Sequence, residues 1–229
     1  MKESIYTIPI SEVFEPKDGC PLCRLRDTLE ERAVEYILGA AMMEPDVREE
    51  TNRLGFCIGH YRQMLARKSR LQMALTMQTR LAHLLDELEK PKIPSRPEKN
   101  THTCYVCEKL DGAMSMMRAN IYQMYAAHED FRRLYGEQTG LCYDHCRYLL
   151  AGASALPRKY QKTFAEETAR LCREQLDPLF EEVSTFCRQF DYRAQGHSGF
   201  GTSRDSIERS IRAVTGEDPG AFVPGKKNE

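Results

Sequence analysis

The feature that most constrains this chain of 229 residues is a pair of CxxC motifs and a pair of CxxH motifs in matched order. The first pair is CPLC at Cys20–Cys23 and CIGH at Cys57–His60, and the second is CYVC at Cys104–Cys107 and CYDH at Cys142–His145. The CxxC motifs are 84 residues apart and the CxxH motifs 85, and each CxxH follows a glycine and an apolar residue. One inserted residue reconciles the two halves, so the sequence indicates a duplicated unit.

The ligand types and their spacing predict a metal site in each unit. Two residues between cysteines let both thiolates face one ion, and a cysteine and a histidine three residues apart on the first turn of a helix share a face. Three thiolates and one imidazole suit tetrahedral zinc and leave no position for water or substrate. We therefore expect two structural Zn²⁺ ions per chain. The first predicted site consists of Cys20, Cys23, Cys57 and His60, and the second of Cys104, Cys107, Cys142 and His145.

Two other functions are compatible with these cysteines. Cysteine with one histidine can also hold an iron–sulfur cluster, although zinc is the commoner occupant of sites with this spacing. A thioredoxin-like redox pair is disfavoured, because neither CxxC lies in a strand-to-helix context. Cys146 has Tyr61 as its counterpart in the repeat, so we interpret it as a bystander thiol, and His102 would be the spare ligand.

The segments between the motifs predict helices. Apolar residues recur at steps of three and four in residues 24–42, and Pro45 fits the first position of a following short helix. Residues 61–90 contain no proline or glycine, which predicts one long amphipathic helix with a leucine stripe. A second long helix follows Pro157, and a short one is expected over 206–216. Little alternates with period two, so the predicted fold is mostly α.

These elements suggest a domain organisation based on the repeat. Residues 1–89 form the first metal-binding helical unit, and 104–190 form the second. The linker, 90–103, is rich in proline and charge, and 191–229 form a C-terminal loop, a short helix and a tail. We expect the apolar stripes of the long helices to pack together, with a homodimer as a further way to bury them.

Charge and hydropathy exclude some classes of partner. Lysine plus arginine (33) nearly cancels aspartate plus glutamate (34), so no field of one sign favours nucleic acid or an anionic membrane. No stretch reaches the roughly 18 apolar residues of a membrane span. We expect a cytoplasmic protein, where nine cysteines favour metal binding over disulfides. A nucleic-acid contact is a weaker alternative, through the basic residues Arg62, Arg67, Lys68, Arg70 and Arg80.

The doubled motifs, with FDYR at Phe190–Arg193 and GTSRD at Gly201–Asp205, carry a resemblance. The chain resembles a bacterial family catalogued as a domain of unknown function, whose members share the CxxC…CxxH arrangement and an FDYR…GTS stretch. The resemblance spans essentially the whole chain. It implies a prokaryotic cytosolic protein and supplies no activity.

The sequence favours a non-enzymatic function. It contains no G-x-x-x-x-G-K-[ST], G-x-S-x-G or HExxH motif. We therefore expect an adaptor or regulatory protein that binds a protein partner. One alternative is a metal-thiolate or iron–sulfur enzyme or sensor for redox or alkyl-transfer chemistry. Another is a small-molecule carrier with a methionine-lined pocket between the units.

Overall fold

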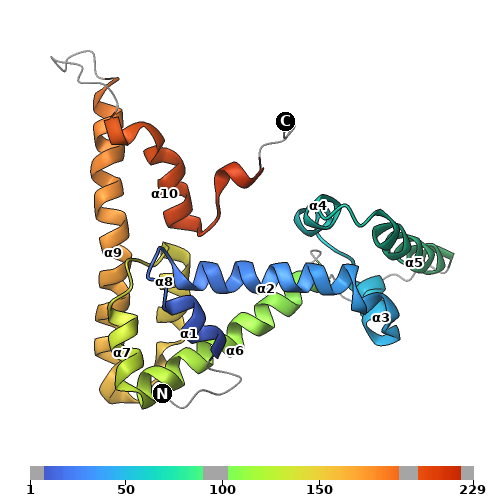
Figure 1. The fold of residues 1–229 in the computed structure, drawn as a ribbon, viewed down its shortest axis with the longest axis horizontal. Helices are drawn as coiled ribbons and strands as arrows, with labels where there is room; N and C mark the ends of the chain where they lie inside the picture. Colours follow the sequence, from blue (N-terminus) through green and yellow to red (C-terminus); the bar gives the residue numbers. More distant parts are fainter. Residues whose placement is uncertain (1–7, 90–102, 191–200, 223–229) are drawn as a thin grey trace. The chain divides into compact units, whose positions relative to one another are not determined.

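The computed structural model describes residues 8–89, 103–190 and 201–222, which form ten α-helices and four short 3₁₀ helices with no strand among them (Figure 1). The predicted mostly-α class is therefore confirmed. Within the same ranges, every helix is too short or too polar to cross a bilayer. His102, residues 90–102 of the predicted linker, and Asp191–Arg193 of the FDYR stretch lie outside the described residues.

The chain divides into two compact units, which we describe separately. One consists of Met1–Leu25 together with Met117–Glu229, and the other is Arg26–Met116. The boundaries fall inside α2 (Pro21–Leu38) and α6 (Tyr105–Ala127), the helices that begin with the two CxxC motifs. The compact units therefore differ from the expected division at residues 90–103, because each takes helical segments from both repeats.

The unit Arg26–Met116 contains the 3₁₀ helix η1 (Ala40–Met43), α3 (Pro45–Leu54), α4 (Ile58–Ala66) and α5 (Arg70–Glu89). Proline is the first residue of α3, as predicted, and α3 packs against α5. One buried cluster joins the end of α2 and the helices that follow it to the start of α6. Its members are Val34, Ile37, Leu38, Leu54, Phe56, Met64, Met73, Cys104, Tyr105 and Val106.

The single long helix predicted over 61–90 is wrong, because the chain breaks between α4 and α5. Lys68 at the break has φ of 60°, in the left-handed region that ends helices. The preceding residue, Arg67, bonds Glu35 at 2.9 Å and Glu31 at 3.0 Å. These contacts hold the end of α4 on α2 while α5 turns to pack on α3, so tertiary contacts outweigh helix propensity here.

The other unit is built around the long helix α9 (Arg158–Arg188), which contains Pro178. Helix α10 (Ser206–Thr215) runs beside it (Figure 1), and Arg209 of α10 forms an ion pair with Glu182 of α9. The predicted short helix over 206–216 is thereby confirmed. The remaining elements are α1 (Ile8–Phe14), α7 (Glu129–Gly136), α8 (Tyr143–Ala151), η2 (Ala153–Ala155), η3 (Gly201–Asp205) and η4 (Pro219–Phe222).

Aromatic side chains form the core of this second unit. Phe164 of α9 is fully buried, and its ring centroid lies 4.9 Å from that of Tyr125 and 5.2 Å from that of Tyr135. The Tyr125 hydroxyl donates to Glu167 at 2.6 Å, so the polar end of this buried ring is satisfied. The core therefore fastens α6 and α7 to α9.

Replacing Phe164 tests this core. Phe164→Ala removes a fully buried ring, so we expect the free energy of unfolding to fall by about 3–5 kcal/mol in denaturant titrations. Phe180→Ala on the same helix is the control, since its side chain is 70% exposed, and its loss should stay below about 1 kcal/mol. Equal losses for the two variants would contradict the packing described.

Candidate metal centres

Each of the four motifs forms the N-terminus of an α-helix. In each, the carbonyl oxygen of the first cysteine accepts a hydrogen bond from the amide four residues later, so this cysteine occupies the N-cap position. The second ligand then lies three residues further on, in the first turn. N-cap and N3 side chains face each other, so each motif forms a clip of two ligands. The bonds are Arg24 N–Cys20 O at 3.3 Å, Tyr61 N–Cys57 O at 3.0 Å, Glu108 N–Cys104 O at 3.0 Å and Cys146 N–Cys142 O at 2.9 Å.

The structure brings these clips together in pairs that cross the repeat. All eight predicted ligands fall in two clusters of four, in each of which the ligand atoms lie within 4.8 Å of one another. The predicted pairing within each repeat is wrong, because each CxxC motif meets the CxxH motif of the other half. Site A consists of Cys20, Cys23, Cys142 and His145, and site B of Cys57, His60, Cys104 and Cys107.

Helix lengths explain why a CxxC motif does not meet the CxxH of its own repeat. Helix α2 has 18 residues and carries the chain about 27 Å from its start. Helix α3 has 10 residues and returns over only about 15 Å. Leu54 and Phe56, which lead into the first CxxH, are buried in one cluster with Val34 near the end of α2. The first CxxH therefore stays beside the end of α2.

The start of α6 docks on this same place and completes site B. The amide of Tyr105 donates to the carbonyl of Gly55 at 2.9 Å, and the hydroxyl of Thr103 donates to the carbonyl of Leu54 at 2.8 Å. Gly55 has φ of 64°, a conformation that favours glycine. The glycine before the first CxxH thus allows the sharp turn that carries Cys57 toward Cys104.

The second CxxH is displaced from its own CxxC in the same way. Helix α6 has 23 residues and extends over about 35 Å, whereas α7 has 8 residues and returns over about 12 Å. The hydroxyl of Tyr122, late in α6, donates to the carbonyl of Leu149 in α8 at 2.5 Å. Helix α8 therefore lies by the second half of α6.

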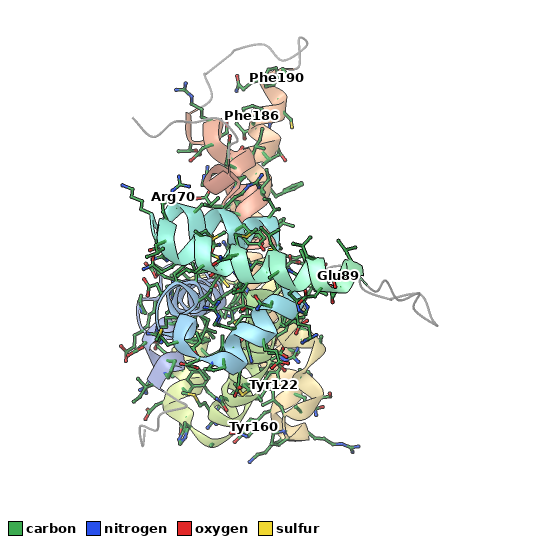
Figure 2. All side chains as sticks on the ribbon, turned by 90° about the vertical axis from the view of Figure 1, so that its right-hand side faces the viewer. Arg70, Glu89, Tyr122, Tyr160, Phe186 and Phe190 are labelled. Atoms are coloured by element: carbon green, nitrogen blue, oxygen red, sulfur yellow. The ribbon has the colours of Figure 1, made fainter. Side chains whose placement is uncertain are left out.

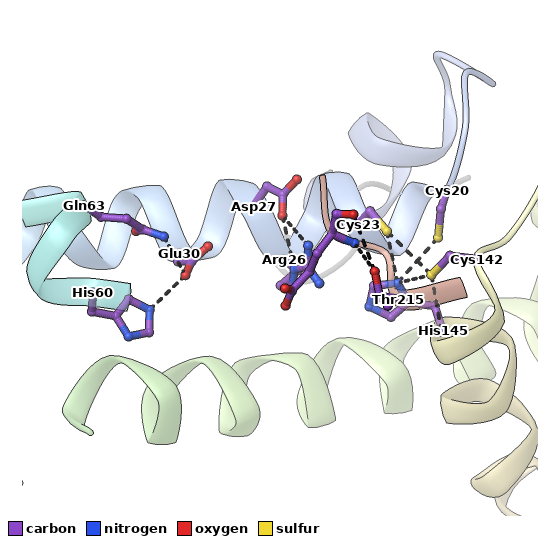
Figure 3. Close-up of polar contacts among 11 residues, drawn as sticks. Cys20, Cys23, Arg26, Asp27, Glu30, His60, Gln63, Cys142, His145 and Thr215 are labelled. Carbon is purple, nitrogen blue, oxygen red and sulfur yellow. Dashed lines mark hydrogen bonds and ion pairs between the residues drawn. The ribbon is translucent and has the colours of Figure 1, made fainter. Parts of the chain in front are cut away.

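The N-terminal segment supplies the missing ligands of site A. Gln138 is buried and donates to the carbonyl of Phe14 at 2.7 Å. The amide of Gly19 donates to the hydroxyl of Thr139 at 3.1 Å. These bonds lay the segment before α2 along the residues before α8. Cys20 and Cys23 are thereby placed beside Cys142 and His145 (Figure 3).

Distances in both clusters fit a single tetrahedral ion. With metal–sulfur bonds of about 2.3 Å and metal–nitrogen bonds of about 2.0 Å, a tetrahedron separates two sulfurs by about 3.8 Å and sulfur from nitrogen by about 3.5 Å. In site A, Nδ1 of His145 lies 3.1, 3.3 and 3.6 Å from the sulfurs of Cys142, Cys23 and Cys20, and the sulfurs of Cys23 and Cys142 are 3.7 Å apart. In site B, Nδ1 of His60 lies 3.1, 3.2 and 3.6 Å from Cys57, Cys104 and Cys107, and the sulfurs of Cys57 and Cys107 are 4.0 Å apart.

In site B a carboxylate also binds the second ring nitrogen of the histidine. His60 presents Nδ1 to the sulfurs and donates from Nε2 to Glu30 of α2 at 2.8 Å, while Gln63 donates to the same carboxylate oxygen at 2.9 Å (Figure 3). Such a carboxylate fixes the orientation of a metal-binding imidazole and makes it more basic. Glu30 is not among the residues predicted from the sequence, and the repeat carries no signal for it, since the matching position is Met114.

The protonation of site B shows how its charges are coupled. Burial lowers the pKa of His60, but hydrogen bonds to Cys104 and Glu30 outweigh burial and raise that pKa to about 10. Burial raises the pKa of Cys104, but its hydrogen bond with His60 contributes to a net fall to about 6. Burial and the neighbouring Cys104 raise the pKa of Cys107. One thiolate is thus favoured by the protein itself, and further thiolates need a cation between them.

In site A, too, the pKa of one cysteine is lowered while that of another is raised. Hydrogen bonds from Cys142 and Cys23 hold the pKa of Cys20 well below its usual range. Hydrogen bonds to Cys142 and Cys20, burial, and the negative charge of these two neighbours raise the pKa of Cys23 far above that of an ordinary thiol. A divalent cation would remove this conflict, because metal-bound cysteines are deprotonated.

The remaining cysteines lie outside both clusters. All nine cysteines of the chain are free thiols. Cys146 is buried and directs its sulfur to the carbonyl of Thr168, 3.8 Å away. It belongs to neither group of ligands, in agreement with its interpretation as a bystander thiol.

The fold and the two clusters define an all-α protein with two candidate Cys₃His metal centres. A family described as "Family of unknown function (DUF6062)" matches residues 1–221, and the chain belongs to this family. The resemblance seen in the doubled motifs is thereby confirmed. No curated protein and no solved structure matches the chain. Any function must therefore be argued from the site.

Two quadruple variants test the crossed pairing. The first removes site A through Cys20→Ser, Cys23→Ser, Cys142→Ser and His145→Ala. The second removes the first CxxC and the first CxxH through Cys20→Ser, Cys23→Ser, Cys57→Ser and His60→Ala. We expect the first variant to keep one tightly bound metal ion per chain and the second to keep none, by elemental analysis after desalting. The reverse result would support pairing within each repeat.

The contact of Glu30 with His60 predicts that Glu30 strengthens metal binding at site B. Glu30→Gln, made in the variant that lacks site A, should weaken metal binding by about 10- to 100-fold in competition with a chelator, because the imidazole loses its carboxylate. Glu31→Gln is the matched control, since Glu31 pairs with Arg67 on the surface. If both variants bind metal like their parent, Glu30 does not support the site.

Proposed function

We propose that the protein binds two Zn²⁺ ions as structural elements and acts as a non-enzymatic adaptor or regulatory protein. The observation that carries this proposal is the convergence of three sulfurs and one imidazole nitrogen in each cluster, at separations that suit one ion. A complete tetrahedral shell of protein ligands is typical of structural zinc and leaves no position for a substrate.

The separations favour one ion over an iron–sulfur cluster. The sulfurs of Cys23 and Cys142 are 3.7 Å apart, and those of Cys57 and Cys107 are 4.0 Å apart. Both distances are close to the edge of a tetrahedron around a single atom. A cluster of several irons and sulfides placed between its cysteines would require a wider arrangement.

Charge balance also suits zinc. Zn²⁺ with three thiolates and a neutral imidazole carries one net negative charge. Each site lies at two helix N-termini, those of α2 and α8 in site A and those of α4 and α6 in site B. Each N-terminus carries about half a positive charge, so two of them offset the charge of the complex.

In the proposed role, the ions fix helices whose outer faces contact a protein partner. Helix α10 supports this role, because it exposes an apolar row at steps of four and three residues. A row with this spacing is typical of a helix that docks in a groove or on another helix. Its members are Ile207, Ile211 and Val214.

A reactive metal-thiolate is the second candidate function. Cys57 and Cys107 of site B, and Cys23 of site A, are only partly buried, so an oxidant or alkyl donor could reach their sulfurs.

The hypothesis of a small-molecule carrier has less support. A hollow of about 560 Å³ in the unit Arg26–Met116 contains one methionine among its lining residues, which are Met43, Pro45, Arg48, Glu49, Asn52 and His83.

Purification of the tagged native protein tests the proposal, with metal content, absorption and bound molecules measured on one sample. We expect two zinc ions per chain, no absorption band in the visible, and a protein partner in a fixed ratio to the chain. A brown sample that contains iron would contradict structural zinc. A bound small molecule in place of a protein would favour the carrier.

A further inference from the structure

Helix α5 buries one face and exposes a second, apolar one. Met73 and Thr76 are buried on the side that packs on α3. On the other side, four leucines have most of their surface exposed, at 67% for Leu71, 52% for Leu81, 64% for Leu85 and 71% for Leu88. Figure 2 shows this helix from Arg70 to Glu89 with its side chains. The leucine stripe predicted from the sequence therefore exists, and among the described residues of the unit Arg26–Met116 nothing covers it.

The spacing of the exposed face is that of a coiled coil. Steps of three and four residues alternate along it without interruption, which gives the period of 3.5 that distinguishes a coiled-coil seam from an ordinary amphipathic helix. Every residue at these steps is exposed. They are Leu71, Ala74, Gln78, Leu81, Leu85 and Leu88.

The charges at the ends of α5 oppose its own dipole. Arg70 is the first residue, and the acidic residues Asp86, Glu87 and Glu89 lie in the last turn. A helix is stabilised by the opposite arrangement, with acids at its N-terminus and bases at its C-terminus. A second α5 packed antiparallel would reverse the effect, because its acidic end would lie beside the basic end of the first.

We propose that two copies of the chain associate through α5 as an antiparallel two-helix coiled coil. Pairing the helices about their midpoints places Leu71 opposite Leu88 of the partner copy, and it brings the end that carries Arg70 to the height of the partner's acidic end. The same register sets Ala74 against Leu85, a small residue against a large one, and Gln78 against Leu81. The face is thus complementary to itself in shape and in charge.

A parallel pair in register lacks this complementarity. It would bring the two basic starts together at one end and the two acidic ends together at the other, which is repulsive at both ends. It would also leave two Ala74 side chains facing each other across a gap.

Self-association through α5 goes beyond the proposed zinc-binding role and does not depend on which metal is bound.

The experiment is sedimentation velocity on the metal-loaded full chain over a range of concentrations. We expect a dimer, and we expect Leu85→Glu to give a monomer with unchanged metal content and helicity, since this side chain is already exposed. Ile211→Glu on α10 is the control for a charge placed in another exposed apolar row, and it should leave the dimer intact. A chain that stays monomeric at every concentration overturns the proposal, as does a dimer insensitive to Leu85→Glu.

Exchange of the end charges tests the direction of the helices. Arg70→Glu and Glu89→Arg should each weaken self-association by about 5- to 30-fold, because the attraction between the basic end of one helix and the acidic end of the other becomes repulsion at both ends of the dimer. The double variant should restore it, and the two single variants should associate when mixed. A double variant as weak as the single ones would overturn the antiparallel arrangement, and no effect from any exchange would place the contact elsewhere.

Discussion

The structure depends on the contact between two helix N-termini at each cluster of ligands. In every motif a cysteine occupies the N-cap position and a second ligand follows in the first turn, so the helix itself sets the geometry of the pair. Unsatisfied amides at a helix start favour negative charge. Thiolates at these positions would be stabilised by the helices they begin, and a cation shared by the thiolates would hold the two helices together.

The crossed pairing links the two repeats of the chain at both clusters. Each cluster takes one clip from each repeat, so neither repeat can complete a site alone. Each compact unit likewise combines helical segments from both halves. This arrangement makes the two halves interdependent, in the way that exchanged elements do in a swapped dimer.

Much of this could be predicted from the sequence, because spacing alone identifies ligands and helices. All eight ligands, the first residue of α3 and the span of α10 follow from local patterns of cysteine, proline and apolar residues. The pairing was predicted wrongly because spacing says nothing about direction. The relative lengths of α2 and α3, about two to one, held the missing information, since a short helix does not retrace a long one.

Other features depend on contacts that no local pattern shows. The break at Lys68 arises because Arg67 bonds to acids of α2, and the sequence there reads as continuous helix. Glu30 supports His60 across 30 residues and has no counterpart in the other repeat. The leucine stripe of α5 was recognised, but its exposure follows from the opposite face of the helix packing on α3.

Anomalous diffraction at the zinc absorption edge, from crystals of the metal-loaded protein, tests the central claim most directly. We expect two peaks per chain, one about 2.3 Å from the sulfurs of Cys20, Cys23 and Cys142 and one equally close to those of Cys57, Cys104 and Cys107. A peak bound by Cys20 and Cys23 together with Cys57 would contradict it.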